Sequence, residues 1–211
     1  MSHTGAETVE ARPPHTIAGV LLAAGLSTRM GTPKALLDWG GRPLVVYQLE
    51  QLRLAGCDPL LLVTGHAAED VEAAASGSGA TIVRNPAYRE GRATSVRAAA
   101  MALPTGLDAI LLLNVDQPRR AETLASLMAA HRHGHGPISV PVFEGRRGHP
   151  AIFASTLLDE LRAVDEASEG LRAVSRRHTA ARTEVDFPSA EVLLDCNDPA
   201  AYERALAFWA R

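Results

Sequence analysis

The chain has 211 residues, of which 46% are hydrophobic and 21% are charged, and its formal net charge is -3 at pH 7. This length and composition predict one domain with a sizeable core, and the charge balance gives no reason to expect a nucleic acid or an anionic membrane as a partner. The two cysteines, Cys57 and Cys196, are too few and too far apart for a disulfide framework or a zinc site, so a reducing cytoplasm is the expected compartment.

The first 16 residues contain no apolar core segment of a signal peptide. We therefore expect a disordered leader over residues 1–16 and a single domain over residues 17–211. No apolar run approaches the ~20 residues that a membrane-spanning helix needs, so no membrane association is expected.

A phosphate-binding loop is predicted at the start of this domain, over residues 17–34, which read IAGVLLAAGLSTRMGTPK. Residues 17–24 are apolar and end at Gly25, which is typical of a strand buried on both faces. The small, polar and cationic residues that follow include Arg29 and Lys34. Glycines let backbone N–H groups approach an anion, and the two cations would neutralise its charge.

Two common phosphate-binding loops do not fit this stretch. A Walker A loop needs lysine directly after its second glycine, whereas two residues separate Gly31 from Lys34. A dinucleotide fingerprint needs three close glycines and an acidic residue at the end of the next strand. The next predicted strand ends in Thr64-Gly65-His66, without an acid, so this pattern fails as well.

The rest of the chain alternates between helical and strand patterns. Helices are predicted over residues 43–55, 67–75, 91–103 and 120–133, and strands over residues 59–64, 80–83, 108–114 and 138–143. The last third is less regular: a turn and a short strand within 144–153, helices near 155–164 and 169–177, strands near 183–185 and 192–194, and a closing helix over 199–209. This rhythm predicts an α/β fold, a single Rossmann-like, mostly parallel sheet with helices on both faces.

A metal site is predicted after strand 108–114, the most hydrophobic segment of the chain. Ligands of open α/β sheets bind beyond the carboxyl ends of the strands, and Asp116 follows this strand directly. Mg²⁺ prefers hard oxygen ligands and often takes one or two protein groups together with phosphates. Asp116 would need one partner from the later segment D-C-N-D-P, where both Asp195 and Asn197 qualify and the sequence does not choose.

Three further clusters have both a functional and an ordinary interpretation. The first turn of helix 91–103 carries Gly91, Thr94 and Ser95, which suit either an anion or a plain helix cap. The turn over residues 145–150 places two arginines and a histidine beside glycines, which suits an anionic second substrate or a solvated basic hairpin. Three alternating histidines at 131, 133 and 135 do not share one helical face and are expected to be solvated.

Several of these motifs together resemble one family, the MobA-like NTP transferases, and within it the molybdenum cofactor cytidylyltransferases. The opening loop LAAGLSTRMGTPKALL is similar to the family's nucleotide loop, NPAYREGRATSV to its base and ribose segment, VDQP to its metal motif, GRRGHP to its G-x-R-G-H-P segment, and LLDCNDPAAY to its closing element. Two departures occur: Val115 stands where the family usually has glycine, and Asn197 stands where it usually has a second acid.

The resemblance implies a fold of the nucleotide-diphospho-sugar transferase type and a set of site residues. Lys34, Arg29 and Asp116 would be catalytic, Asp116 and Asn197 would bind Mg²⁺, and Arg147, Gly148 and His149 would contact the pterin substrate. The nucleotide would be bound by Ala23, Ala24, Gly25, Ser27, Arg29, Gly31, Lys34, Thr64, Gly65, Asn85, Gly91 and Ser95.

The implied reaction transfers CMP from CTP to the terminal phosphate of molybdopterin. The implied partners are these two substrates and a molybdenum hydroxylase apoenzyme, with the protein itself a monomer. Alternatives are another NTP or another acceptor, such as a sugar phosphate, and a non-catalytic cofactor chaperone. A nicotinamide oxidoreductase is the least favoured alternative, because the glycine triplet and the ribose-binding acid are missing.

Overall fold

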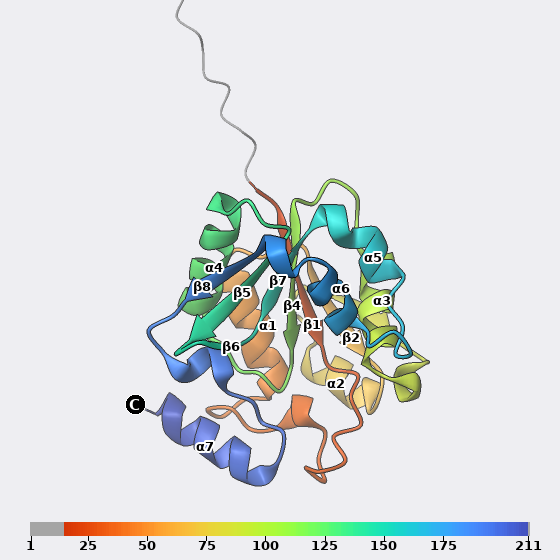
Figure 1. Ribbon diagram of the computed structural model, residues 1–211. Coiled ribbons are helices and arrows are strands. Elements are labelled where there is room, and N and C mark those ends of the chain that lie inside the picture. The colour runs from red at the N-terminus through yellow and green to blue at the C-terminus, as the bar shows by residue number, and fades with distance from the viewer. Residues whose placement is uncertain (1–14, 211) are drawn as a thin grey trace, which may run out of the picture.

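A computed structural model, which describes residues 15–210, has an eight-stranded sheet at its centre (Figure 1). The strands are β1 (Ile17–Leu22), β2 (Leu60–Thr64), β3 (Thr81–Arg84), β4 (Ala109–Asn114), β5 (Ile138–Phe143), β6 (Arg146–Arg147), β7 (Ala151–Ala154) and β8 (Arg182–Asp186). Their order is β3-β2-β1-β4-β7-β5-β6, with β8 paired to β5. The pairs among β3, β2, β1 and β4 are parallel, as is β5 with β8, whereas β7 is antiparallel to both of its neighbours.

Helices cover both faces of the sheet (Figure 1). They are α1 (Leu44–Leu54), α2 (Ala68–Ala74), α3 (Arg92–Ala102), α4 (Ala121–His133), α5 (Leu158–Arg162), α6 (Leu171–Arg177) and α7 (Pro199–Trp209). Short 3-10 turns occur at Lys34–Leu36, Tyr88–Glu90, Ser155–Leu157, Thr179–Ala181 and Ala190–Leu193. The predicted α/β fold with a mostly parallel sheet is confirmed.

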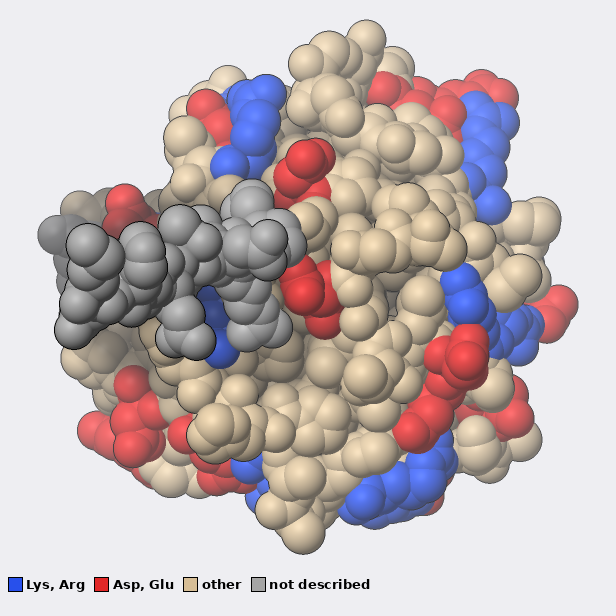
Figure 2. All heavy atoms as spheres, turned by 90° about the horizontal axis from the view of Figure 1, so that it is seen from above, with Lys and Arg blue, Asp and Glu red and all other residues tan. Residues whose placement is uncertain are grey.

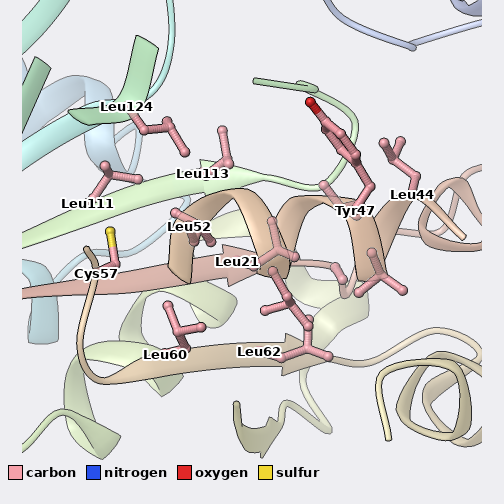
Figure 3. Close-up of a cluster of buried hydrophobic side chains, with 14 of the residues drawn as sticks. Leu21, Leu44, Tyr47, Leu52, Cys57, Leu60, Leu62, Leu111, Leu113 and Leu124 are labelled. Atoms are coloured by element: carbon pink, nitrogen blue, oxygen red, sulfur yellow. The ribbon is translucent and has the colours of Figure 1, made fainter. Parts of the chain in front are cut away.

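Alternation of side chains along the strands builds two cores, one on each face. Leu111 and Leu113 of β4 join the cluster that contains residues of α1 and α4, as Figure 3 shows for Leu52 and Leu124. Ile110 and Leu112 of the same strand belong to the opposite cluster, which contains residues of α3 and α5. A strand buried on both faces needs a continuous apolar run, and that is the pattern from which β1, β2 and β4 were predicted.

The predicted strand over residues 192–194 is wrong, because this stretch belongs to the 3-10 turn Ala190–Leu193 and the residue after it. Its carbonyl groups accept hydrogen bonds from a side chain, Arg119, and from the backbone N–H of His149, instead of pairing with a strand. The other predicted elements that are described begin and end within about two residues of those observed, apart from 155–164, which is a 3-10 turn followed by α5.

The predicted leader over residues 1–16 lies outside the described residues except for His15 and Thr16. The Thr16 N–H donates to Asp108 Oδ2 (2.8 Å), and the Asp108 N–H donates to the Thr16 carbonyl (2.9 Å). Figure 2 looks onto this end of the molecule, where β1 begins; on the part not covered in grey, acidic and basic side chains are interspersed. Within residues 15–210, no helix is long and apolar enough to cross a membrane.

Candidate active site

A cleft of about 530 Å³ opens at the carboxyl ends of β1 and β4. These are the strand ends that carry the arrowheads in Figure 1. The register of the sheet places Leu22, at the end of β1, opposite both Val63 and Asn114. The loops that leave these strands therefore meet at one edge, as is general for ligand sites of open α/β sheets. Among the predicted site residues, those that line the cleft are Ala23, Ala24, Gly25, Ser27, Lys34, Gly91, Ser95, Asp116, His149 and Asn197.

The loop after β1 is folded back on itself by Ser27. Ser27 has a positive φ of 53°, and its Oγ accepts a hydrogen bond from the backbone N–H of Lys34 (2.9 Å). Gly31 also has a positive φ, 69°, a conformation that glycine adopts without strain. This local folding fixes the start of the Lys34–Leu36 turn, so the Lys34 side chain extends into the cleft from a held backbone.

Lys34, Asp116 and Asn197 converge in the cleft although they are far apart in sequence. The Lys34 Nζ donates to Asp116 Oδ2 (2.7 Å) and to Asn197 Oδ1 (2.9 Å). The backbone joins the two acceptor loops as well, because the Cys196 N–H donates to the Asp116 carbonyl (2.7 Å). The lysine and aspartate side chains are only 13% and 20% exposed, so this pair is screened less than a surface salt bridge.

The oxygens of Asp116 and Asn197 suit a divalent cation. They already share one cationic group, and a carboxylate with an amide oxygen is a hard donor set of the kind that Mg²⁺ prefers. Among the described residues, no group of three or more His, Cys, Asp and Glu side chains is placed to hold a metal. A cation at this position would therefore complete its coordination with phosphate oxygens and water.

A buried arginine that the sequence pattern did not single out connects the loops around this cluster. Arg119 is 0% exposed and donates from Nε to the His149 carbonyl (2.8 Å) and from Nη2 to the carbonyls of Val192 (2.8 Å) and Leu194 (3.2 Å). Burial lowers the pKa of Arg119 to about 10. Its carbonyl partners join the turn 145–150 to the segment that leads to Asn197. An arginine just before a predicted helix gives no sequence signal of such burial.

Within the turn 145–150, one of the three predicted substrate-binding residues lines the cleft. Gly148 packs against the chain after β8, where an added Cβ would lie 2.2 Å from the carbonyl oxygen of Val192. Arg147 points elsewhere and pairs with Glu184 (2.9 Å). His149 lines the cleft, and its pKa is lowered to about 4, first by desolvation and then by the cations Arg119 and Arg92.

Three predicted nucleotide-binding residues stand behind the cleft wall. The buried side-chain amide of Asn85 donates to the hydroxyls of Thr94 (2.8 Å) and Ser95 (2.9 Å), and its Oδ1 accepts from the Ala87 N–H (3.0 Å). The Thr64 hydroxyl bonds Glu72 Oε1 (2.8 Å). An added Cβ on Gly65 would come within 2.8 Å of the Cβ of Ala24, so Gly65 permits close packing there. Arg29 and Gly31 are exposed outside the cleft lining.

Two arginines that line the cleft were not predicted as site residues: Arg92 at the start of α3 and Arg89 in the preceding 3-10 turn Tyr88–Glu90. Arg92 is the first residue of α3, and no residue in the described part of the chain forms a hydrogen bond or an ion pair with its guanidinium. Desolvation lowers the pKa of Arg92, and the charge of Asp116 opposes this shift. Arg89 lies over the ring of Tyr88, 5.3 Å from its centroid. Glu166 caps the helix, accepting from the Ala93 N–H (2.5 Å).

The alternating histidines line a different cavity, of about 450 Å³, at the opposite end of the sheet. It is bordered by His15, Asp108, His131, His133 and His135. The ring of His131 is hydrogen-bonded to the Ser139 hydroxyl (2.8 Å), and desolvation lowers its pKa. His133 and His135 are exposed, as expected, whereas His131 is partly buried and departs from the expectation that all three histidines are solvated.

Comparison with known proteins places the cleft in context. The family model described as "MobA-like NTP transferase domain" matches residues 19–183. The nicotine blue oxidoreductase of Paenarthrobacter nicotinovorans is 32% identical over 89% of this chain and 90% of its own length. The molybdenum cofactor cytidylyltransferase of Escherichia coli is 29% identical over 85% of this chain and 90% of its own. The bifunctional protein GlmU of Anaeromyxobacter sp. is 36% identical over 75% of this chain, but the chain spans only 34% of that relative.

Solved structures share the fold over nearly the whole chain. Rv0371c from Mycobacterium tuberculosis is 31% identical, with a TM-score of 0.80 over 92% of this chain and 98% of its own. A structure of the same mycobacterial protein in complex with manganese has a TM-score of 0.74 and 28% identity over 91% of this chain and 98% of its own.

Proposed function

The chain belongs to the MobA-like NTP transferase family, and we propose that it transfers CMP from CTP to the terminal phosphate of molybdopterin and releases pyrophosphate. Nucleotidyl transfer is the chemistry that the family membership supports. The observation that carries the proposal is the convergence of Lys34, Asp116 and Asn197 beside the loop after β1, in a cleft at the carboxyl ends of the strands.

The residues around the nucleotide would act by position and charge. An acceptor phosphate is already an anion, so its oxygen can attack the α-phosphorus without a strong general base, and the bond from the α-phosphorus to the pyrophosphate oxygen breaks. Backbone N–H groups between Gly25 and Gly31 would hold the triphosphate. Lys34 and Arg29 would offset the charge that builds on the leaving pyrophosphate.

Asp116 and Asn197 are the residues that would hold Mg²⁺, which we propose as the cofactor. The metal would supply charge neutralisation to the phosphates, as is general in phosphoryl transfer. Manganese in the mycobacterial relative supports a divalent cation in this family, and the shared hard oxygens of this cleft support its place here. Asp195 also lines the cleft, so a direct role for its carboxylate stays open.

The acceptor would enter on the side of the cleft formed by α3 and the turn 145–150. His149 and Arg92 both line this side, and the charge of Arg92 helps to lower the pKa of His149. Because Arg92 has no partner among the described residues, we assign it to the acceptor phosphate. The name of the Escherichia coli relative, a molybdenum cofactor cytidylyltransferase, supports the molybdenum cofactor as acceptor and a cytidylyl group as the group transferred.

The decisive experiment measures pyrophosphate release from CTP, GTP and ATP, each with molybdopterin and with a sugar phosphate as acceptor. The proposal predicts release with CTP and molybdopterin, and its loss in Asp116→Asn. Release only with another nucleotide or with the sugar phosphate would overturn the substrate assignment and leave nucleotidyl transfer intact.

An oxidoreductase is the second candidate, because one relative of similar length is a nicotine blue oxidoreductase. Oxidation of NADH or NADPH in the presence of a quinone-like dye, with no pyrophosphate release from any nucleotide, would favour it. The convergence of Lys34, Asp116 and Asn197, with two oxygens that we assign to a divalent cation, favours the transferase.

We also propose that the protein is a cytoplasmic monomer and that it transfers its product to a molybdenum hydroxylase apoenzyme. The two cysteines are unpaired and buried, which agrees with a reducing compartment.

A further inference from the structure

Lys34 binds the two groups that we assign to the metal. Its ammonium lies 2.7 Å from Asp116 Oδ2 and 2.9 Å from Asn197 Oδ1, and it is mostly removed from solvent. Its backbone N–H is held by Ser27 Oγ, so the loop presents the side chain to this position. The lysine thus already neutralises the one carboxylate of the proposed metal site.

A divalent cation and this ammonium cannot share the two oxygens in this arrangement. Mg²⁺ binds its oxygen ligands at about 2.0–2.1 Å, so a cation that contacts both oxygens would occupy the space of the ammonium group. Two positive charges at such short range also repel strongly in a partly buried cleft. For a metal to contact both Asp116 Oδ2 and Asn197 Oδ1, the ammonium has to move away from them.

We infer that Lys34 competes with the divalent cation for Asp116 and Asn197, so that the site takes the metal as its complex with a nucleoside triphosphate. This inference rests on the proposed function, because the triphosphate supplies what the exchange needs. Its oxygens offer the displaced ammonium a new anionic partner and offer the metal further ligands. Lysine is suited to the exchange, since its charge sits on a flexible four-carbon stem.

The exchange predicts coupled binding. Metal alone would have to break an ion pair to reach the site, whereas metal with nucleotide leaves both cations with anionic partners. By linkage, the nucleotide raises the affinity for the metal by the same factor by which the metal raises the affinity for the nucleotide.

The test measures Mn²⁺ binding by electron paramagnetic resonance, with and without a non-hydrolysable CTP analogue. Lys34→Met removes the charge while keeping an unbranched side chain, and we expect it to tighten Mn²⁺ binding without nucleotide by about 10-fold. Arg29→Met is the matched control, because it removes one positive charge from the same loop without touching Asp116 or Asn197. Circular dichroism verifies that each variant is folded.

The wild-type protein should gain more Mn²⁺ affinity from the CTP analogue than Lys34→Met does, and Asp116→Asn combined with Lys34→Met should abolish the tightened binding. Equal Mn²⁺ affinities of wild type and Lys34→Met without nucleotide would overturn the inference. So would equal tightening by Arg29→Met, which would indicate a general charge effect, or weaker binding in Lys34→Met, which would make the lysine a support of the ligands.

This measurement needs no turnover. Tightened Mn²⁺ binding in Lys34→Met, combined with absent pyrophosphate release by the wild-type protein, would reject the proposed reaction and keep the cation exchange. Pyrophosphate release by the wild-type protein without tightened Mn²⁺ binding in Lys34→Met would reject the cation exchange and keep the proposed reaction.

Discussion

At the scale of single residues, the cleft is dominated by charges from distant parts of the chain. Lys34 and Asp116 form a partly buried pair, and Asn197 accepts a second hydrogen bond from Lys34. Arg92 faces the same space without a partner among the described residues. Cys196 lies between Asp195 and Asn197, the two candidate partners of Asp116, and is buried. Desolvation raises the pKa of its thiol to about 12, so the thiol is unreactive there.

Asp116→Asn and Lys34→Ala should each lower the rate of pyrophosphate release by about 10²–10³ while the protein stays folded. Removing one preorganised charged group from a transition state typically costs this much. Fixed-time pyrophosphate assays with saturating CTP measure the rate of release, and circular dichroism tests whether each variant is folded. Near-wild-type release by either variant would show that its assigned role is wrong.

Arg92→Gln should raise the KM for the acceptor by at least about 10-fold, because a hydrogen bond to a charged group contributes about 1.5–3 kcal/mol. The KM for CTP should change much less. Arg89→Gln is the matched control, since Arg89 lines the same cleft but lies against Tyr88. A change confined to the KM for CTP would move Arg92 to the nucleotide side.

His149 should make the wild-type protein less stable as the pH falls from about 6.5 towards 4. Its pKa is about 4 in the folded protein, below the ordinary value of 6.5, so the unfolded chain takes up the proton first as pH falls. Full stability is present above the unfolded pKa. Urea unfolding at several pH values should show a shallower loss for His149→Asn than for wild type; parallel curves would contradict the assignment.

At the scale of elements, side-chain hydrogen bonds connect the turn 145–150 to the segment after Ala190, and the sequences of these loops do not indicate the connection. Arg119 donates to carbonyls of the turn 145–150 and of the segment after Ala190, which is why that segment is not a strand. The helix α7 was predicted correctly, because Asp198 caps it through the Ala201 N–H (2.8 Å) and Pro199 opens it. Caps are local signals, whereas the contacts of Arg119 are not.

Gly148→Ala should destabilise the protein by about 1–3 kcal/mol, because the added methyl group would overlap the carbonyl oxygen of Val192 at 2.2 Å. It should also raise the KM for the acceptor by displacing His149. Gly145→Asn is the control: Gly145 has a positive φ of 73° that asparagine tolerates, and an added Cβ meets no atom within 4 Å. Denaturant unfolding of both variants measures the difference, and equal stabilities would show that the close approach is relaxed in solution.

At the scale of the whole molecule, the two cores keep the sheet edge that carries the cleft in place. β4 contributes side chains to both cores and ends at Asn114, two residues before Asp116. The position of the Asp116 carboxylate, which we propose as a metal ligand, therefore depends on packing along this central strand.

Leu113→Ala should lower the free energy of unfolding by about 2–5 kcal/mol, since Leu113 is fully buried and its truncation leaves a cavity. The same substitution at Leu54, which is 66% exposed, should change it by no more than about 0.5 kcal/mol. Urea unfolding of both variants provides the comparison. A small effect at Leu113 would mean that the core around β4 can collapse to fill the space.

Much of this molecule was decided by patterns within the sequence. Apolar runs marked the strands that are buried on both faces, and caps and glycines marked the helix ends, because both signals depend on neighbours a few residues away. The glycines and cations of residues 17–34 likewise predicted an anion-binding loop, and Asp116 was predicted from its place after a buried strand.

Only the tertiary structure decided which of these residues meet. Asn85 carries a side chain suited to a nucleotide, yet its polar atoms are used within the wall of the cleft. Arg119 and Arg92 have no local signal, and their roles arise from loops that approach across the sheet edge. The contact of Lys34 with both Asp116 and Asn197 likewise arises only because separate loops approach one another. Backbone propensity and burial act locally along the chain, whereas the meeting of charges at a site depends on how separate elements pack.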